Sequence, residues 1–200
     1  MRPKLFIATN NQGKVKEIRA SLQNLDLDLV LPVDLHLELD VDEDGQTYAE
    51  NATKKALAFS RASGLTALAD DSGLEVDVLD GAPGLHSARY STLPNATDAD
   101  RRATLLLNLS QYPRPWAAKF RATIAIASPG RGVKLAEGIC PGEIVPTERG
   151  KGGFGYDPIF LLSDINKTMA ELQMDEKNRL SHRGQAVRKA IPILVELLKI

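Results

Sequence analysis

Hydrophobic and polar residues follow two spacings along the first third of the chain, one typical of strands and one typical of helices. Residues 5–8 form a short apolar run that predicts a buried strand. Over residues 15–25, apolar side chains recur at steps of three and four, which predicts an amphipathic helix. Residues 27–31 predict a second strand. The order strand, polar loop, helix and strand is typical of α/β proteins.

Capping residues mark further elements in the middle of the chain. Thr47 and Glu50 have the spacing of a capping box, so we expect a second helix to begin there and to end at Gly64. Residues 66–69 predict a short strand that runs directly into polar residues. Another helix is expected over residues 97–109.

The second half of the chain favours antiparallel strands and a final helix. Hydrophobic and polar residues alternate over residues 120–126, which predicts a half-buried strand, and residues 133–135 predict its hairpin partner. Ser181 can cap a last helix, which Pro192 should kink or split. Because helices and strands are mixed throughout, we expect an α/β fold with a mixed β-sheet rather than a purely parallel one.

The overall composition narrows the class of protein. The chain has 200 residues, 43% of them hydrophobic and 26% charged, which suits a single globular domain over residues 1–200. A protein that neutralises many backbone phosphates needs a basic surface, and the net charge is −1, so we expect no nucleic-acid partner. No stretch approaches the roughly 20 apolar residues of a membrane span. The only cysteine, Cys140, allows no intrachain disulfide, and we expect a cytoplasmic protein without membrane association.

The first candidate site is the polar turn between the first strand and the first helix. It consists of Thr9, Asn10, Asn11, Gln12, Gly13 and Lys14. Backbone N–H groups and the dipole at a helix N-terminus favour an anion, and Lys14 adds a positive charge. The Walker spacing is absent, because Val15 stands where that motif has Ser or Thr. A phosphate-binding turn and an ordinary polar cap are both compatible with this sequence.

Two groups of acids form the second candidate site. Asp70 and Asp71 follow a predicted strand, and if that strand continued, its two-residue period would direct them to opposite faces. The acidic residues 42–44 could join Asp71 in binding magnesium, which takes one or two protein carboxylates together with substrate phosphates. Both groups could instead be solvated surface acids. Of the adjacent Lys54 and Lys55, one could point at phosphate while the other is solvated.

A glycine-rich loop over residues 150–158 forms the third candidate site. Glycine permits close approach of the backbone to a ligand, and Phe154 or Tyr156 could stack on a base. The same aromatic rings could instead fill the core. Lys177 and residues 181–183 place cationic groups near the start of the last helix, which suits an anion site or a solvated basic surface.

Five segments carry a family resemblance. They are Ala-Thr-Asn-Asn-Gln-Gly-Lys at 8–14, Ala-Asp-Asp-Ser-Gly-Leu at 69–74, Gly-Ala-Pro-Gly at 81–84 with Ser-Ala-Arg-Tyr at 87–90, residues 152–160, and Ser-His-Arg at 181–183. In this order and spacing they resemble the noncanonical purine nucleoside triphosphate pyrophosphatases, the inosine and xanthosine triphosphate pyrophosphatase family.

The resemblance implies an activity and an architecture. The activity is Mg²⁺-dependent hydrolysis of inosine, deoxyinosine or xanthosine triphosphate to the monophosphate and pyrophosphate, which removes deaminated purines from the nucleotide pool. The implied architecture is an elongated mixed α/β fold with two lobes around a central active-site cleft. A homodimer is also implied.

The resemblance further implies roles for individual residues. The nucleotide and its phosphates would be held by Thr9, Asn10, Asn11, Gln12, Gly13, Lys14, Lys55 and Ser72. Asp71 would be the general base that activates water and, with Glu43, a magnesium ligand, while Asp70 supports it and Asp42 remains an alternative to Glu43. The base would be recognised by Phe154, Gly155, Tyr156, Asp157, Lys177, His182 and Arg183.

Two alternative functions stay open. One is a pyrophosphatase of related fold that prefers pyrimidine triphosphates, and the other is a nucleotide sensor without catalytic activity.

A carboxylate such as Asp71, near a reference pKa of about 3.9, would be ionised at neutral pH but a weak base. Acids beside two anion sites favour an enzyme over a sensor, because binding alone rarely needs extra negative charge near phosphates.

Overall fold

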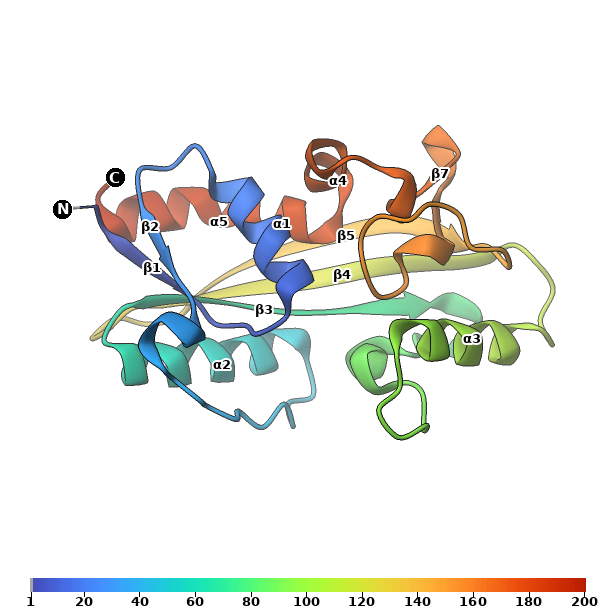
Figure 1. Cartoon of the computed structure of the whole chain (residues 1–200), viewed down its shortest axis with the longest axis horizontal. Helices are drawn as coiled ribbons and strands as arrows, with labels where there is room; N and C mark the ends of the chain where they lie inside the picture. Colours follow the sequence, from blue (N-terminus) through green and yellow to red (C-terminus); the bar gives the residue numbers. More distant parts are fainter. Residues whose placement is uncertain (1) are drawn as a thin grey trace. The chain divides into compact units, whose positions relative to one another are not determined.

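The computed structural model of the chain describes residues 2–200 and contains a mixed β-sheet with flanking helices (Figure 1). The strands that these residues form are ordered β2-β1-β3-β4-β5-β6-β7 across the sheet. Their bounds are β1 Lys4–Ile7, β2 Asp28–Val30, β3 Thr66–Val76, β4 Trp116–Ala127, β5 Lys134–Ile144, β6 Phe160–Leu162 and β7 Lys167–Thr168. The helices are α1 Gln12–Leu22, α2 Tyr48–Ser63, α3 Asp98–Leu109, α4 Met174–Leu180 and α5 His182–Leu198.

The strand pairing confirms the predicted mixed sheet. β1 pairs in parallel with both β2 and β3. β5 pairs antiparallel with β6, and β6 pairs antiparallel with β7. The neighbouring strands β4 and β5 are joined by only a few residues, which is the connection of a hairpin, as expected. The chain therefore belongs to the α/β class.

The chain divides into two compact units. The first comprises residues up to Asp71 together with Ala122–Gly138 and His182–Ile200. The second comprises Ser72–Arg121 and Ile139–Ser181. The long strands β3, β4 and β5 contribute residues to both units. Whether the chain acts as one domain of two lobes stays a prediction.

The first unit has helices on both faces of its part of the sheet (Figure 1). Leu5 and Ile7 of β1 pack in one cluster with Ile18 of α1 and with α5. Phe6 of β1 points the other way and packs with α2, where its ring lies 5.3 Å from that of Phe59. The two-residue period of the strand thus separates two cores, one on each face.

Coverage on both faces corrects one expectation about β4. Residues 120–126 were expected to be half-buried, but Thr123 and Ala125, on the face predicted to be exposed, are 1% and 0% exposed. Ala125 packs in the same cluster as α2, while Ile124 packs with α1 and α5. A central strand between two helical layers is buried on both sides, whatever its polar residues suggest.

Two further elements differ from the sequence expectations. β3 continues to Val76 instead of ending at residue 69, so the polar stretch after residue 69 is strand and not turn. Pro192 does not split the last helix, because α5 runs without interruption through it. Both results reflect packing by neighbouring elements that outweighs a local breaking signal.

The predicted caps at Thr47 and Thr97 are present, but the Glu50 carboxylate accepts from the Gln46 N–H instead of closing the expected capping box on Thr47. The Oγ1 of Thr47 accepts a hydrogen bond from the Glu50 N–H at 3.1 Å, and Gly64 ends α2 with a φ of 70°. The Oγ1 of Thr97 accepts from the Asp100 N–H at 3.3 Å at the start of α3. These side chains satisfy N–H groups that a helix start leaves without partners in the helix.

The second unit has its own core. Leu105 and Leu109 of α3 pack against Trp116 and Phe120 of β4, and the ring of Phe120 lies 4.4 Å from that of Phe160.

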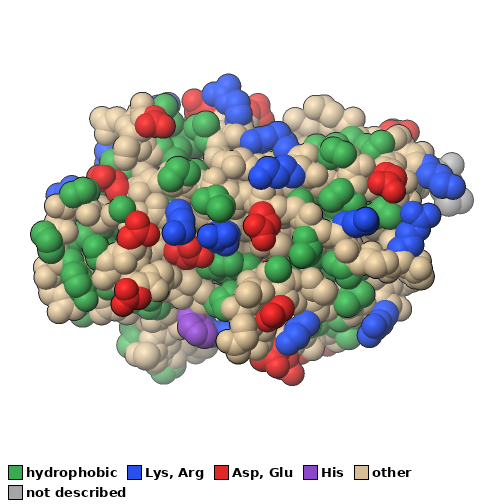
Figure 2. Space-filling model, turned by 180° about the vertical axis from the view of Figure 1, so that it is seen from behind, with side chains coloured by type: hydrophobic (Ala, Val, Ile, Leu, Met, Phe, Trp, Pro, Cys, Tyr) green, Lys and Arg blue, Asp and Glu red, His purple; other side chains and the backbone are tan. Residues whose placement is uncertain are grey.

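On the face drawn in Figure 2, acidic and basic side chains are interspersed with hydrophobic ones. Across residues 2–200, no helix combines the length and the hydropathy needed to cross a bilayer.

Candidate active site

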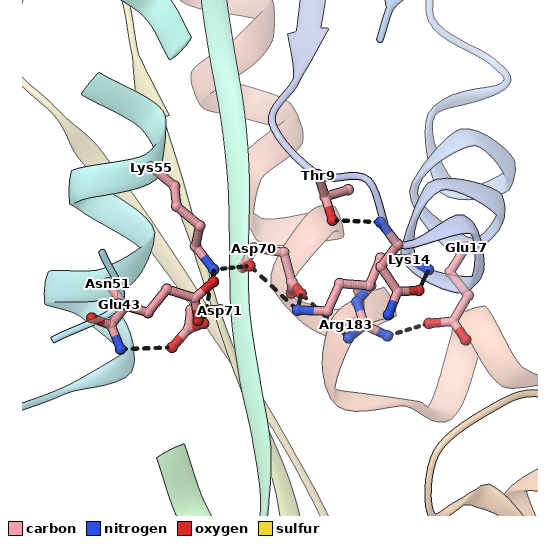
Figure 3. A network of polar contacts seen from close by, with 10 residues as sticks. Thr9, Lys14, Glu17, Glu43, Asn51, Lys55, Asp70, Asp71 and Arg183 are labelled. Atoms are coloured by element: carbon pink, nitrogen blue, oxygen red, sulfur yellow. Dashed lines mark hydrogen bonds and ion pairs between the residues drawn. The ribbon is translucent and has the colours of Figure 1, made fainter. Parts of the chain in front are cut away.

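The two adjacent aspartates lie inside β3 and point to opposite sides of it (Figure 3). Asp71 is directed toward α2, and Asp70 is directed toward α1 and α5. The strand period therefore separates two carboxylates that would otherwise repel each other at close range. Both are buried, with residue exposures of 1% for Asp70 and 6% for Asp71.

The carboxylate of Asp71 is held by two side chains of α2. Lys55 Nζ lies 2.9 Å from Asp71 Oδ1, and Asn51 Nδ2 donates to Asp71 Oδ2 at 3.5 Å. Asn51 and Lys55 are four residues apart, so they share one face of the helix. Asn51 Oδ1 also accepts from the Gly45 N–H at 2.8 Å, which attaches the end of the acidic loop to this site.

The acidic loop contributes a second carboxylate. Glu43 Oε1 lies 3.2 Å from Lys55 Nζ, so Glu43 and Asp71 meet at the same buried ammonium group. Lys54 points outward instead and pairs with the exposed Asp44. The two lysines therefore differ as expected in exposure, with Lys55 facing the carboxylates and Lys54 at the surface, while a contact of Lys55 with phosphate stays a prediction. Glu43 and Asp42 were the two loop acids considered as metal ligands, and the acid that contacts Lys55 is Glu43.

Burial changes the basicity of Asp71. Removal from water raises the pKa of the Asp71 carboxyl above its usual value, although Lys55 opposes this and Glu43 adds to it. The expectation of an ordinary carboxyl pKa did not include burial, which shifts the pKa of Asp71 upward, and its role as general base stays a prediction. A carboxylate with a raised pKa accepts a proton from water more readily.

The carboxylate of Asp70 lies in a chain of ion pairs. Its Oδ2 is 2.7 Å from Lys14 Nζ and 3.3 Å from Arg183 Nη2, and the guanidinium of Arg183 also bonds to Glu17. Burial opposes ionisation of Asp70, but Arg183 and Lys14 outweigh it and hold the pKa well below its usual range. Asp70 is thus a fixed negative charge rather than a proton acceptor.

Two lysines from separate motifs meet at one backbone atom. The carbonyl oxygen of Asp70 accepts from Lys55 Nζ at 3.0 Å and from Lys14 Nζ at 3.4 Å. Lys14 belongs to the predicted phosphate turn, where the Asn11 side chain caps α1 by accepting from the Lys14 N–H at 3.1 Å. Within this turn, Thr9 Oγ1 accepts from the Asn11 N–H at 3.2 Å. The helix start, two ammonium groups and the Asp71 carboxylate therefore lie side by side.

The acids of this site are suited to a hard cation. Among residues 2–200 no group of three or more His, Cys, Asp or Glu side chains is arranged to hold a metal ion. Asp71 and Glu43 are two oxygen donors around one cationic position, which fits magnesium, because that ion takes few protein ligands and keeps the remaining positions for water and phosphate. That Asp71 and Glu43 bind magnesium stays a prediction, since the position they share is filled by the Lys55 ammonium group.

The residues predicted to recognise the base divide between the two units. Phe154, Gly155, Tyr156, Asp157 and Lys177 belong to the second unit, as does Ser72, and His182 and Arg183 belong to the first. Lys177 Nζ bonds to the Asp157 carboxylate and lies 5.1 Å from the centre of the Phe154 ring. His182 begins α5 and is 5% exposed. Arg183 is 3% exposed and bonded to two carboxylates, so its predicted contact with the base stays a prediction.

The two aromatic residues of the glycine-rich loop have different surroundings. Tyr156 is 5% exposed, packs in the core of the second unit and donates from its hydroxyl to the Ser87 carbonyl at 2.9 Å. Tyr156 thus fills the core, the alternative that the sequence left open, and a part for it in base recognition stays a prediction. Phe154 is less buried than Tyr156, and Lys177 Nζ lies over its ring.

Packing inside the protein explains two of the loop glycines. Gly150 has a φ of 82°, and a Cβ there would lie 2.4 Å from the Ala170 backbone. Gly153 has a φ of 70°, and a Cβ there would lie 2.0 Å from the Asp157 carboxylate. These glycines let the loop fold back on itself. Close approach of a ligand is not needed to account for them.

Two residues of this polar network, Glu17 and Asn51, were not predicted from the sequence. Glu17 is 2% exposed and pairs with a residue 166 positions away, which no local pattern indicates. Its spacing of three from Lys14 on the predicted helix was the one available signal. Asn51 could have been found from its spacing of four from Lys55 on the second helix.

Comparison with known proteins places the chain in a family. The model of the Ham1 family matches residues 5–193. The chain belongs to the Ham1 family. A dITP/XTP pyrophosphatase of Desulforamulus reducens is 48% identical, with 97% of this chain and 96% of the relative covered. A dITP/XTP pyrophosphatase of Geobacter sulfurreducens is also 48% identical, over 92% of each chain.

Solved structures of this family share the fold. A HAM1 protein from Coxiella burnetii superposes with a TM-score of 0.86 at 37% identity, covering 97% of this chain and 99% of the other. The Ham1 protein of Staphylococcus aureus gives a TM-score of 0.81 at 38% identity, covering 98% of both chains. The mixed sheet with flanking helices is thus the architecture of the family, and the resemblance stated from the sequence is confirmed.

Proposed function

We propose that this Ham1 family protein hydrolyses inosine, deoxyinosine and xanthosine triphosphates to the monophosphate and pyrophosphate. The observation that carries the proposal is the convergence of Lys14 and Lys55 on the Asp70 carbonyl beside the Asp71 carboxylate. Two neighbouring ammonium groups, one of them from the start of α1, suit a polyanionic phosphate chain, and a carboxylate beside them suits activation of water. Relatives that are dITP/XTP pyrophosphatases support the choice of substrate.

Each residue has a defined part in this reaction. Lys14, Lys55 and the turn from Thr9 bind the triphosphate and offset its charge. Asp71 accepts a proton from water as the water oxygen bonds to phosphorus, and the anhydride bond between the α- and β-phosphates breaks with release of pyrophosphate. Asp71 and Glu43 would hold a magnesium ion, which when bound acts as a Lewis acid on the phosphate oxygens.

Base selection is proposed to involve Phe154 and Lys177. The Phe154 ring offers a stacking surface, and Lys177 offers a hydrogen-bond donor for a 6-oxo group. A site built to donate to a 6-oxo group leaves a buried donor unpaired against the 6-amino group of adenine, which lowers the affinity for adenosine triphosphate.

The decisive experiment is a substrate panel. Magnesium-dependent pyrophosphate release is measured with inosine, xanthosine, adenosine, guanosine and uridine triphosphates, for the wild type and for Asp71→Asn in parallel. We expect rapid release from the inosine and xanthosine nucleotides by the wild type only. Preference for uridine triphosphate would favour a pyrimidine-specific enzyme, and tight binding without release would favour a sensor. The predicted homodimer is tested separately by light scattering.

A further inference from the structure

The backbone N–H and the carbonyl oxygen of Gly155 are both bonded to side chains of one helix. Its N–H donates to Asp98 Oδ2 at 2.7 Å, and its carbonyl oxygen accepts from Arg102 Nη1 at 2.8 Å. Asp98 and Arg102 are four residues apart on α3, so they project from one face of that helix. Both hydrogen bonds have a charged partner, which makes them stronger than bonds between neutral groups.

Both side chains are themselves anchored. Arg102 Nε and Nη2 bond to the two oxygens of the Glu148 carboxylate at 2.7 and 3.1 Å. Asp98 Oδ1 pairs with Arg101 at 2.5 Å. The Arg102 side chain is only 12% exposed, so its guanidinium has a single well-defined place. A bidentate pair of this kind fixes the orientation of the planar group as well as its position.

The peptide that they hold lies between the two residues that orient the loop. Gly155 directly follows Phe154, whose ring is the stacking surface of the proposed function, and precedes Tyr156, whose hydroxyl is bonded in the core. The Phe154 N–H donates to Asp157 Oδ2 at 2.8 Å, the same oxygen to which Lys177 bonds. A shift of the Gly155 peptide would therefore move both the stacking ring and the acid that positions Lys177.

We propose that Asp98 and Arg102 are positioning residues that set base specificity by fixing the loop of residues 153–157. This inference rests on the proposed function, and it names the discrimination between 6-oxo and 6-amino purines as the property that depends on α3. Discrimination of this kind requires donors and acceptors held to within a fraction of an ångström. In the described hydrogen bonds neither Asp98 nor Arg102 contacts Lys14, Lys55 or Asp71. We call the two hydrogen bonds from Asp98 and Arg102 to Gly155 the clamp, and its loss should change selectivity more than the chemical step.

The test compares variants of α3 on two substrates. For Asp98→Ala and Arg102→Met, we expect the ratio of kcat/KM for inosine triphosphate over adenosine triphosphate to fall about tenfold, mainly through a higher KM for the inosine nucleotide. Asp98→Asn keeps an oxygen that can accept from the Gly155 N–H and should restore most of the ratio. Arg102→Lys cannot bond Glu148 and Gly155 with one fork and should lose selectivity partially.

The matched control is Asp100→Ala. Asp100 lies in the same first turn of α3 and takes part in its cap, but it has no described contact with Gly155. This variant should lose helix stability and keep the selectivity ratio. Urea unfolding of every variant separates loss of folding from loss of selectivity. Unchanged ratios in folded Asp98→Ala and Arg102→Met, or an equal loss in Asp100→Ala, would overturn the proposal.

The two proposals fail in different ways. If the wild type releases no pyrophosphate from any triphosphate, the proposed function fails. The clamp is then still measurable by calorimetry, as the ratio of the affinities for inosine and adenosine monophosphates in the same variants. If that ratio is the same in the wild type, Asp98→Ala and Arg102→Met, the clamp sets no base specificity. Normal turnover with unchanged selectivity in both clamp variants overturns only the inference about α3.

Discussion

Asp70 and Asp71 have the same side chain and adjacent positions, but β3 directs them into surroundings with opposite effects on a carboxylate. Asp70 meets Arg183 and Lys14, which hold its pKa well below the usual range although burial opposes this. Asp71 pairs with Lys55 and lies near the negative Glu43, and its burial raises the pKa although Lys55 and Lys14 oppose this. The pKa values of these two neighbouring carboxyls are therefore shifted in opposite directions.

The difference teaches how one strand can supply two chemical roles. A structural acid needs enough cations to stay ionised at every relevant pH, and a general base needs a pKa nearer the working pH. The two-residue period of a strand provides both environments to consecutive residues. The following experiments test this division of roles, beginning with the largest expected effect.

Loss of the proton acceptor should have the largest effect on turnover. For Asp71→Asn we expect a fall in kcat of about 10³-fold, because general base catalysis contributes roughly 10² to 10⁴-fold and the amide also removes a metal ligand. The free energy of unfolding should change little. Pyrophosphate release and urea unfolding measure the two quantities. Turnover equal to that of the wild type would show that Asp71 is not the base.

Loss of the cation beside Asp70 should mainly affect stability. Arg183→Met leaves Glu17 and Asp70 buried with less positive charge, so we expect the free energy of unfolding to fall by about 3 to 5 kcal/mol. Urea unfolding at neutral pH measures this. A loss below about 1 kcal/mol, the value of an exposed pair, would mean that the network is not a structural element.

The adjacent lysines of α2 provide a matched pair for the catalytic side. Lys55→Met removes the cation that meets Asp71, and we expect kcat/KM to fall about 10²-fold, the loss typical of removing one group that stabilises transition-state charge. Lys54→Met removes an exposed pair with Asp44 and should leave both activity and the urea midpoint unchanged. Equal effects of the two substitutions would contradict the assignment of Lys55.

The smallest effect concerns the pH dependence of stability. Because the folded-state pKa of Asp70 lies below the unfolded value of about 3.9, its ionised form stabilises the fold above that pH, and the contribution is lost as the pH falls through the folded pKa. The difference in free energy of unfolding between the wild type and Asp70→Asn should thus be constant from about pH 7 to 5 and narrow below about pH 4. A difference that does not vary with pH would place the effect of Asp70 in packing instead of charge.

Much of this arrangement could be predicted from the sequence, because it depends on local signals. The caps at Thr47 and Thr97, the end of α2 at Gly64 and the separation of Asp70 from Asp71 all follow from spacing between near neighbours. The expected family is likewise confirmed by the match over residues 5–193.

The remaining features depend on contacts between distant parts of the chain. β3 extends through four polar or small residues because neighbouring strands pair with it, and no local propensity indicates that length. The burial of Tyr156 depends on a hydrogen bond to Ser87, 69 positions earlier. The pKa of Asp71 depends on burial, which the sequence does not give.

The ion pair between Asp70 and Arg183 has a consequence for folding of the chain during its synthesis on the ribosome. Arg183 is synthesised 113 residues after Asp70, so β3 emerges long before the guanidinium that neutralises its buried carboxylate. In a nascent chain that ends before α5, Asp70 has Lys14 as its described ion-pair partner but not Arg183. Burial away from water is unfavourable for a carboxylate that lacks part of its neutralising charge. We therefore expect β3 to stay in contact with water until α5 has been synthesised. The sheet then does not pack around Asp70 before Arg183 is available.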